Sequence, residues 1–128
     1  MKIFGWDSVD DIARGFAVGT GHRYDGDFKK DPAFPKVREI IIADLDEGGY
    51  EGSAFVLYRR DGKLFEVHGG HCSCHGFEGQ WDPEETTWDA LAMRRYFRMT
   101  REGRAALDVL ITKHASRKAL AAKVLARD

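Results

Sequence analysis

The sequence predicts an α+β domain: a three-stranded antiparallel meander over residues 37–68 with helices packed on one face, followed by a C-terminal helical segment. Segments rich in β-branched and aromatic residues are grouped in the middle of the chain, and segments with helical periodicity lie before and after them. An Asp-Gly pair between two of these segments is typical of an antiparallel hairpin. The 128 residues suit one domain and contain no internal repeat, so we predict a single domain over 1–128.

The first helix is predicted over about residues 8–17. Ser8 is typical of an N-cap, and Asp10 and Asp11 fit the first helical turn, where negative charge is favourable. The glycines and prolines of residues 19–36 then predict a long loop. The apolar side of the helix would comprise Val9, Ile12, Ala13 and Phe16.

Three strands are predicted at 37–45, 50–60 and 63–68. Residues 46–49 form the first turn, and the Asp-Gly pair at 61–62 forms the second, because both central positions of a type I′ turn need positive φ. A two-residue loop fixes the register of the second hairpin. The predicted cross-strand pairs are Arg60 with Lys63, Tyr58 with Phe65, Val56 with Val67, and Phe55 with His68.

A helix is predicted to follow the strands and to begin near Thr86. Thr86 with Asp89 three residues later resembles a capping box, with Asp in the place of the usual Glu. Gly103 interrupts the helical pattern. The apolar stripe of this helix would comprise Trp88, Leu91, Ala92, Tyr96 and Met99.

The last segment, from about residue 104 to 126, is predicted to be helical. His114 and Lys118 fall in the middle of its apolar face, and burying the ammonium group of Lys118 without a partner would be costly. The segment is therefore two helices with a break near Ser116, or one helix whose middle is not buried, or a helix whose stripe is covered by another chain.

Charge is distributed unevenly along a chain whose net charge is −1. Residues 1–100 carry 13 basic and 18 acidic side chains, whereas residues 101–128 carry 7 basic and 3 acidic ones. The overall balance argues against direct nucleic-acid binding. The basic C-terminal segment either complements its own domain or docks on an acidic partner or a second copy of this chain. The predicted contact residues are Arg117, Leu120, Lys123, Val124 and Arg127.

One segment concentrates metal-binding and nucleophilic side chains, because three of the five histidines and both cysteines lie within residues 68–75. Imidazole and thiolate bind zinc and also form nucleophile–base pairs. A closed zinc site usually draws two ligand pairs from separate segments, and the sequence has no second pair. The alternatives are an open zinc site, thiol catalysis, or a Gly-flanked loop with packed cysteines; no cofactor besides zinc is expected and no catalytic residue is assigned. The candidate metal ligands are His71, Cys72, Cys74 and His75.

The cysteines and the hydropathy pattern indicate the cellular compartment of the protein. A disulfide between Cys72 and Cys74 would be strained, and there is no other cysteine. The chain has no long apolar run, and its N-terminus turns acidic within seven residues, which is not the pattern of a signal peptide. We therefore expect a cytoplasmic protein with reduced thiols and no membrane partner.

Residues 50–92 resemble a group of small uncharacterised phage and prophage proteins. The resemblance lies in Tyr50-Glu-Gly-Ser-Ala-Phe-Val-Leu, in Asp-Gly-Lys-Leu-Phe-Glu-Val, and in the string from His71-Cys-Ser-Cys-His-Gly through Trp81 to Trp88. It implies a mobile-element accessory protein that binds a bacterial protein complex, as an anti-CRISPR-like inhibitor of host defence does. The alternative is a small zinc- or thiol-dependent enzyme using residues 71–75. The binding protein is favoured, because the sequence shows neither a recognisable acid–base pair nor a cofactor loop.

Overall fold

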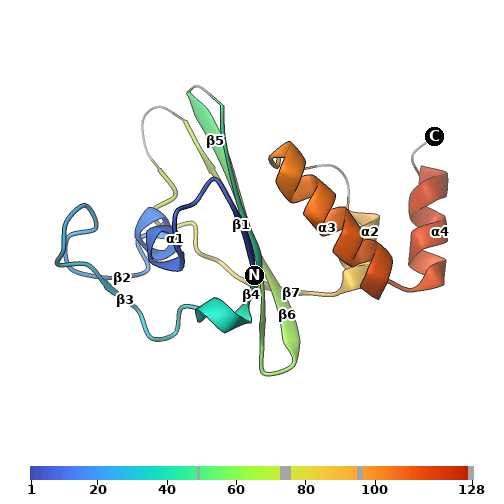
Figure 1. Cartoon of the computed structure of the whole chain (residues 1–128), viewed down its shortest axis with the longest axis horizontal. Coiled ribbons are helices and arrows are strands. Elements are labelled where there is room, and N and C mark those ends of the chain that lie inside the picture. The colour runs from blue at the N-terminus through green and yellow to red at the C-terminus, as the bar shows by residue number, and fades with distance from the viewer. Residues whose placement is uncertain (49, 73–75, 95–96, 127–128) are drawn as a thin grey trace.

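We describe a computed structural model of the chain, which defines all residues except 49, 73–75, 95–96 and 127–128. The protein is α+β, with one five-stranded mixed sheet and one two-stranded sheet. Figure 1 shows the larger sheet nearly edge-on, with helices on both sides of it. Within the described residues, no helix is long and apolar enough to span a membrane.

The predicted meander forms the centre of the larger sheet. Strands β4 (Ile40–Gly48), β5 (Glu51–Arg60) and β6 (Lys63–His71) are antiparallel neighbours. The prediction of only three strands is wrong, because β1 (Lys2–Phe4) lies parallel to β4 and β7 (Glu84–Thr86) lies antiparallel to β6. Both edge strands are three residues long, too short for the sequence to show a strand period.

The second hairpin has the predicted turn and register. Asp61 and Gly62 have φ angles of 53° and 75°, as a type I′ turn requires. All four predicted cross-strand pairs are confirmed, from Arg60 with Lys63 to Phe55 with His68. β6 continues three residues beyond its predicted end and brings His71 opposite Gly52. The extension places the start of the Cys-His segment at one end of the sheet.

Helices cover both faces of the sheet, so the prediction of helices on one face is wrong. α1 (Val9–Phe16) packs on one face, and α2 (Trp88–Met93) and α3 (Arg101–His114) pack on the other, while α4 (Arg117–Ala126) packs against α2 on the side away from the sheet (Figure 1). The apolar run 54–58 of β5 explains this arrangement. Its successive side chains point to opposite faces of the sheet and all are buried, so both faces need a cover.

The N-terminal region follows its prediction in α1 and departs from it afterwards. Ser8 is the N-cap of α1, its hydroxyl accepting the Asp11 backbone N–H at 3.1 Å, and the predicted apolar side is buried. The predicted loop contains a short hairpin of β2 (Gly19–Thr20) and β3 (Lys29–Lys30). Residues Val37–Glu39, predicted as strand, form the 3₁₀ turn η1.

α2 is shorter than predicted. Its N-cap is Thr87 rather than Thr86, because Thr86 belongs to β7 and pairs with Leu64. The helix ends at Met93, so Met99 lies beyond it, and Tyr96 falls outside the described residues.

Gly103 lies inside α3, whereas the sequence predicted a break there. The N-cap Thr100 donates its backbone N–H and its hydroxyl to the buried carboxylate of Asp44, and its hydroxyl accepts the Gly103 backbone N–H. A Cβ at Gly103 would lie only 2.0 Å from Asp44 Oδ1. The glycine is therefore explained by the close approach of α3 to the sheet, which the sequence does not reveal.

The break in the C-terminal segment lies where it was predicted. α3 ends at His114, and α4 begins at Arg117. The Ser116 backbone N–H donates to Asp89 at 2.6 Å, and the Ser116 hydroxyl accepts the Ala119 backbone N–H at 3.1 Å. The chain thereby turns without burying Lys118, which is exposed.

Candidate functional site

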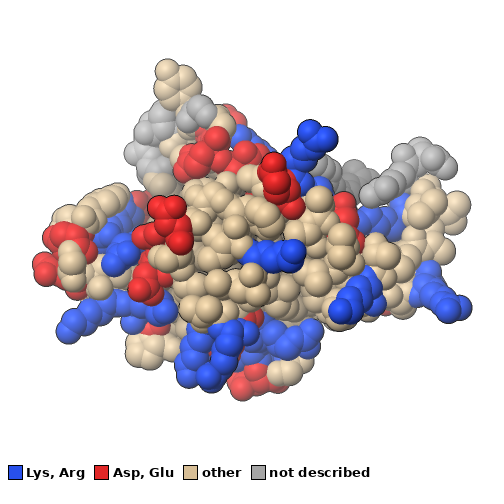
Figure 2. All heavy atoms as spheres, in the orientation of Figure 1, with Lys and Arg blue, Asp and Glu red and all other residues tan. Residues whose placement is uncertain are grey.

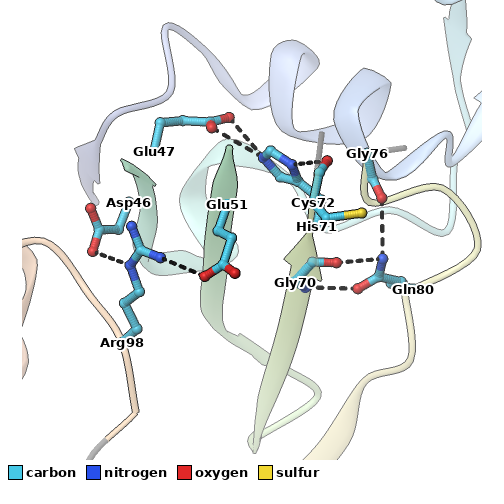
Figure 3. A network of polar contacts seen from close by, with 9 residues as sticks. All are labelled: Asp46, Glu47, Glu51, Gly70, His71, Cys72, Gly76, Gln80 and Arg98. Carbon is cyan, nitrogen blue, oxygen red and sulfur yellow. Dashed lines mark hydrogen bonds and ion pairs between the residues drawn. The ribbon is translucent and has the colours of Figure 1, made fainter. Parts of the chain in front are cut away.

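Three residues form a row across neighbouring strands at one end of the sheet. Glu47 on β4 pairs with Gly52 on β5, and Gly52 pairs with His71 on β6. The His71 side chain crosses over β5, and Nε2 lies 3.1 Å from both carboxylate oxygens of Glu47 (Figure 3). Because a Cβ at Gly52 would lie 2.2 Å from this Nε2, only glycine permits the contact.

The second ring nitrogen of His71 also has an oxygen partner. Nδ1 lies 3.0 Å from the backbone carbonyl of Cys72, and the ring packs edge-on against Phe77 with centroids 4.8 Å apart. The hydrogen bond to the Cys72 carbonyl, together with the carboxylate of Glu47, raises the pKa of His71 above its ordinary value of 6.5. When the ring is protonated, both nitrogens act as donors. To bind zinc or to accept a proton from a thiol, His71 would first have to leave one of these oxygens.

Gln80 holds the two ends of the loop that follows β6. Its side-chain oxygen accepts the Gly70 backbone N–H at 2.8 Å, and its side-chain amide donates to the carbonyls of Gly70 and Gly76 at 2.8 and 3.2 Å (Figure 3). The Gln80 side chain thus forms the two hydrogen bonds with the Gly70 backbone that a neighbouring strand would otherwise form. Sequence reasoning missed Gln80, because a single glutamine carries no pattern that distinguishes it from a solvent-exposed residue.

The predicted zinc ligands are only partly within the described residues. His71 and the exposed Cys72 are described, whereas Cys74 and His75 lie outside the described residues. Across the described ranges, no group of three or more His, Cys, Asp or Glu side chains is placed to hold a metal ion. His68 lies three positions before His71 on β6, so it is on the other face of the sheet. The zinc site stays a prediction.

His68 belongs to a different network, centred on the buried carboxylate of Glu66. His68 Nε2 lies 2.7 Å from this carboxylate, and the guanidinium of Arg94 donates to both of its oxygens. Burial alone would raise the pKa of Glu66, but the hydrogen bonds with His68 and Arg94 outweigh burial and lower the pKa to about 2. These contacts tie the end of α2 to the sheet, which is a structural role.

A cleft of about 690 Å³ lies beside the row, on the α1 side of the sheet. It is bounded by α1, the ends of β4 and β6, and the loops that carry Arg23 and Cys72. Three ion pairs line it: Arg14 with Asp11 at 3.1 Å, Arg23 with Glu78, and His71 with Glu47. Its aromatic side chains are Trp6, Tyr24, Tyr50 and Phe77.

The predicted C-terminal contact residues are divided between two sides of α4. Arg117 and Val124 are exposed, whereas Leu120 packs against the core and Lys123 forms an ion pair with Asp108 at 3.6 Å. Arg127 lies outside the described residues. The structure adds exposed residues that the sequence analysis did not select. We define the outer face of α4 as Arg117, Lys118, Ala121, Val124 and Leu125, all of which are exposed.

The cleft and the outer face of α4 are the two candidate functional regions, and they lie on opposite sides of the sheet. In the space-filling view, the charged side chains over α4 are basic, whereas most acidic side chains visible lie toward α1 and the β4–β5 tip (Figure 2). Comparison with known proteins found no family model, no curated protein and no solved structure that matches this chain.

Proposed function

We propose that this protein acts by binding rather than by catalysis, and that its target is a bacterial protein complex with an acidic contact surface. The observation that carries the proposal is the outer face of α4. It combines two highly exposed aliphatic side chains, Val124 at 66% and Leu125 at 76% exposure, with the basic side chains of Arg117 and Lys118. An apolar centre beside basic residues suits an acidic protein surface.

The geometry of a helix places these residues together. Successive residues are about 100° apart, so the five residues of the outer face span roughly one third of the circumference of α4. Covering Val124 and Leu125 completely would contribute about 1.5–3 kcal/mol for each side chain. These two residues can therefore supply a substantial part of a binding free energy.

The charges of the outer face do not serve the stability of α4. Arg117 and Lys118 are in the first turn, which contains no acidic residue. Cations at a helix N-terminus oppose the helix dipole and cost about 0.3–1 kcal/mol each. A partner that supplies carboxylates would remove this cost, so these positions favour an acidic contact.

The opposite side of α4 fixes the helix to the domain. Ala119 is buried, Lys123 pairs with Asp108, and Ser116 is held by Asp89. The outer face is therefore held in place before a partner binds, which reduces the entropy lost on association.

The setting of the proposal comes from the resemblance of residues 50–92 to small phage and prophage proteins. A small phage protein that binds a host-defence complex can block it by occupying its contact surface, in the manner of an anti-CRISPR inhibitor. The resemblance supports this setting, and the outer face of α4 supports the mode of action.

The experiment compares a double charge reversal on the outer face of α4 with a single charge reversal outside that face. The double variant R117E/K118E should retain the circular dichroism spectrum of the wild type and lose at least about tenfold in capture of the target from phage-carrying bacteria. The control is K113E, which reverses an exposed lysine in the last turn of α3. Wild-type capture should weaken with added salt. Full biological activity of R117E/K118E at physiological salt would contradict the proposal.

A second candidate function is a zinc- or thiol-dependent enzyme, because the exposed Cys72 lines the cleft beside His71. Metal analysis of untagged protein tests it, and about one zinc per chain would favour this candidate. If the cysteines bind zinc, C72S/C74S should lose the metal and several kcal/mol of stability. The sequence predicts instead a loss of about 1–2 kcal/mol with activity intact, as for packed thiols, and the exposure of Cys72 lowers the part of this loss that Cys72 can contribute.

A further inference from the structure

We propose that the cleft on the α1 side is a second interaction surface, which binds a lysine- or arginine-bearing segment of a partner protein. The proposal is independent of α4, since the cleft lies on the other side of the sheet. It rests on three features of the cleft, namely its exposed aromatic side chains, the exposure of its carboxylates, and its fixed walls.

The rim of the cleft carries exposed aromatic rings. Tyr24 and Tyr50 are 76% and 81% exposed. Among the large hydrophobic side chains that are exposed in the described part of the chain, these two are the aromatic ones, and both line the cleft. Both tyrosines offer a large contact area at low entropy cost. The guanidinium of Arg23 already lies over the Tyr24 ring, 4.5 Å from its centroid, so the Tyr50 ring is the one that can attract a ligand ammonium or guanidinium group.

The charges of the cleft favour a cationic ligand. Arg14 and Arg23 are each paired with a carboxylate, Asp11 and Glu78, whereas the partner of Glu47 is the histidine His71. In the pair at the end of the sheet, the Glu47 side chain is 51% exposed and the His71 side chain only 15%. A carboxylate offers about four lone-pair positions. Glu47 can therefore keep its contact with His71 and accept a hydrogen bond from a ligand cation on its solvent-exposed side.

The charges and rings of the cleft favour a protein segment over a nucleic acid or a small amine as the ligand. A nucleic acid would bring phosphates against the exposed carboxylate of Glu47, and the two arginines that line the cleft are already paired with Asp11 and Glu78. A small amine could reach Glu47, but it would leave the two exposed tyrosine rings on the rim uncovered. An extended peptide segment can cover both rings and place one cationic side chain at Glu47.

The walls of the cleft are fixed before any ligand binds. A Cβ at Gly15 would lie 2.9 Å from the ring of Trp6, so this glycine lets Trp6 pack closely on α1. Gly52 in the same way lets His71 reach Glu47. On the third side, Gln80 forms hydrogen bonds with Gly70 and Gly76, which lie before and after Cys72 in the sequence (Figure 3). A preformed cleft loses less conformational entropy on binding.

The test is a titration of the full ¹⁵N-labelled chain, followed by NMR, with the peptide Ac-Gly-Gly-Lys-Leu-Gly-Gly-NH₂. Two control peptides replace the lysine by norleucine or glutamate. We expect shifts at Gly15, Glu47, Gly52 and Phe77 with the lysine peptide, and weaker binding of both controls. The cleft variant Y50S should weaken binding about threefold and Y50F should not, since the ring makes the contact.

Two further variants test whether the lysine peptide binds at the cleft or at α4. E47Q should weaken binding of the lysine peptide about fivefold, because it removes the charge that faces the ligand cation. V124S, on the outer face of α4, should leave binding unchanged. Equal binding of the lysine and norleucine peptides, or shifts confined to α4, would overturn the proposal.

Two outcomes would assign the cleft to another occupant and overturn the peptide assignment. If n-butylammonium alone binds as tightly as the lysine peptide, the site is one for small amines. If the wild-type chain self-associates without peptide and Y50S does not, the occupant is a second copy of this chain.

Discussion

The two faces of the central sheet are covered by different means, and a cleft opens beside the end of the sheet on the α1 face. On the α1 face, one eight-residue helix and several irregular segments pack through aromatic rings, among them Phe16, Phe77 and Trp81. On the other face, α2 and α3 pack through aliphatic side chains such as Leu107 and Ile111. The cleft lies on the α1 face, which the irregular segments cover.

The faces also differ in where their charged groups lie. On the α2–α4 face, the buried carboxylates of Asp44 and Glu66 fasten helices to strands. On the α1 face, the charged pairs of the cleft remain partly exposed. Substitutions on the first face should therefore change stability, and substitutions on the second should change binding or titration. The predictions below are ordered from the largest expected effect to the smallest.

Glu66→Ala should produce the largest loss. It leaves His68 and Arg94 without their shared carboxylate, and we expect a decrease of about 3 kcal/mol in the free energy of unfolding, measured by urea denaturation. In the wild type the folded-state pKa of Glu66, about 2, is below its ordinary 4.5. Its stabilisation is therefore complete above pH 4.5 and is lost as the pH falls toward 2. A variant as stable as the wild type at pH 7 would contradict this role.

Gly103→Ala should destabilise the protein by about 2 kcal/mol, which is the opposite of the usual effect of alanine in a helix. The added Cβ would lie 2.0 Å from Asp44 Oδ1, so α3 must move away from the sheet and weaken the contact between Thr100 and Asp44. Thermal unfolding measures the change. A higher melting temperature for the variant would show that helix propensity prevails over this close approach.

The sequence predicts the centre of the fold well because short-range rules decide it. The Asp-Gly turn fixes the register of β5 and β6, and Ser8 fixes the start of α1. Lys118 on an apolar stripe predicts the break between α3 and α4, because its burial is too costly. Each of these conclusions needs only residues that are near one another in the sequence.

The features that the sequence did not predict depend on long-range contacts. β1 pairs with a strand about forty residues later, and its own three residues carry no pattern. The contact between Glu47 and His71 spans 24 residues and depends on the absence of a side chain at Gly52. The histidines and cysteines of residues 68–75 drew attention by composition, whereas their placement depends on strand register and on Gln80.

Glu47→Gln should have the smallest effect on stability, confined to the α1 face and dependent on pH. The folded-state pKa of His71 is above its ordinary 6.5, so its contact with Glu47 is fully stabilising below pH 6.5 and is lost as the pH rises through the folded-state pKa. The contact is partly exposed and should contribute less than about 1 kcal/mol. In E47Q the pKa of His71, measured by NMR titration of its ring protons, should fall toward 6.5, and the decline of stability above pH 6.5 should flatten. The matched control is E51Q, because Glu51 lies nearby on the other face of the sheet and pairs with Arg98. An equal fall of the His71 pKa in both variants would mean that the general acidity of this end of the sheet, rather than the row of Glu47, Gly52 and His71, keeps the histidine protonated.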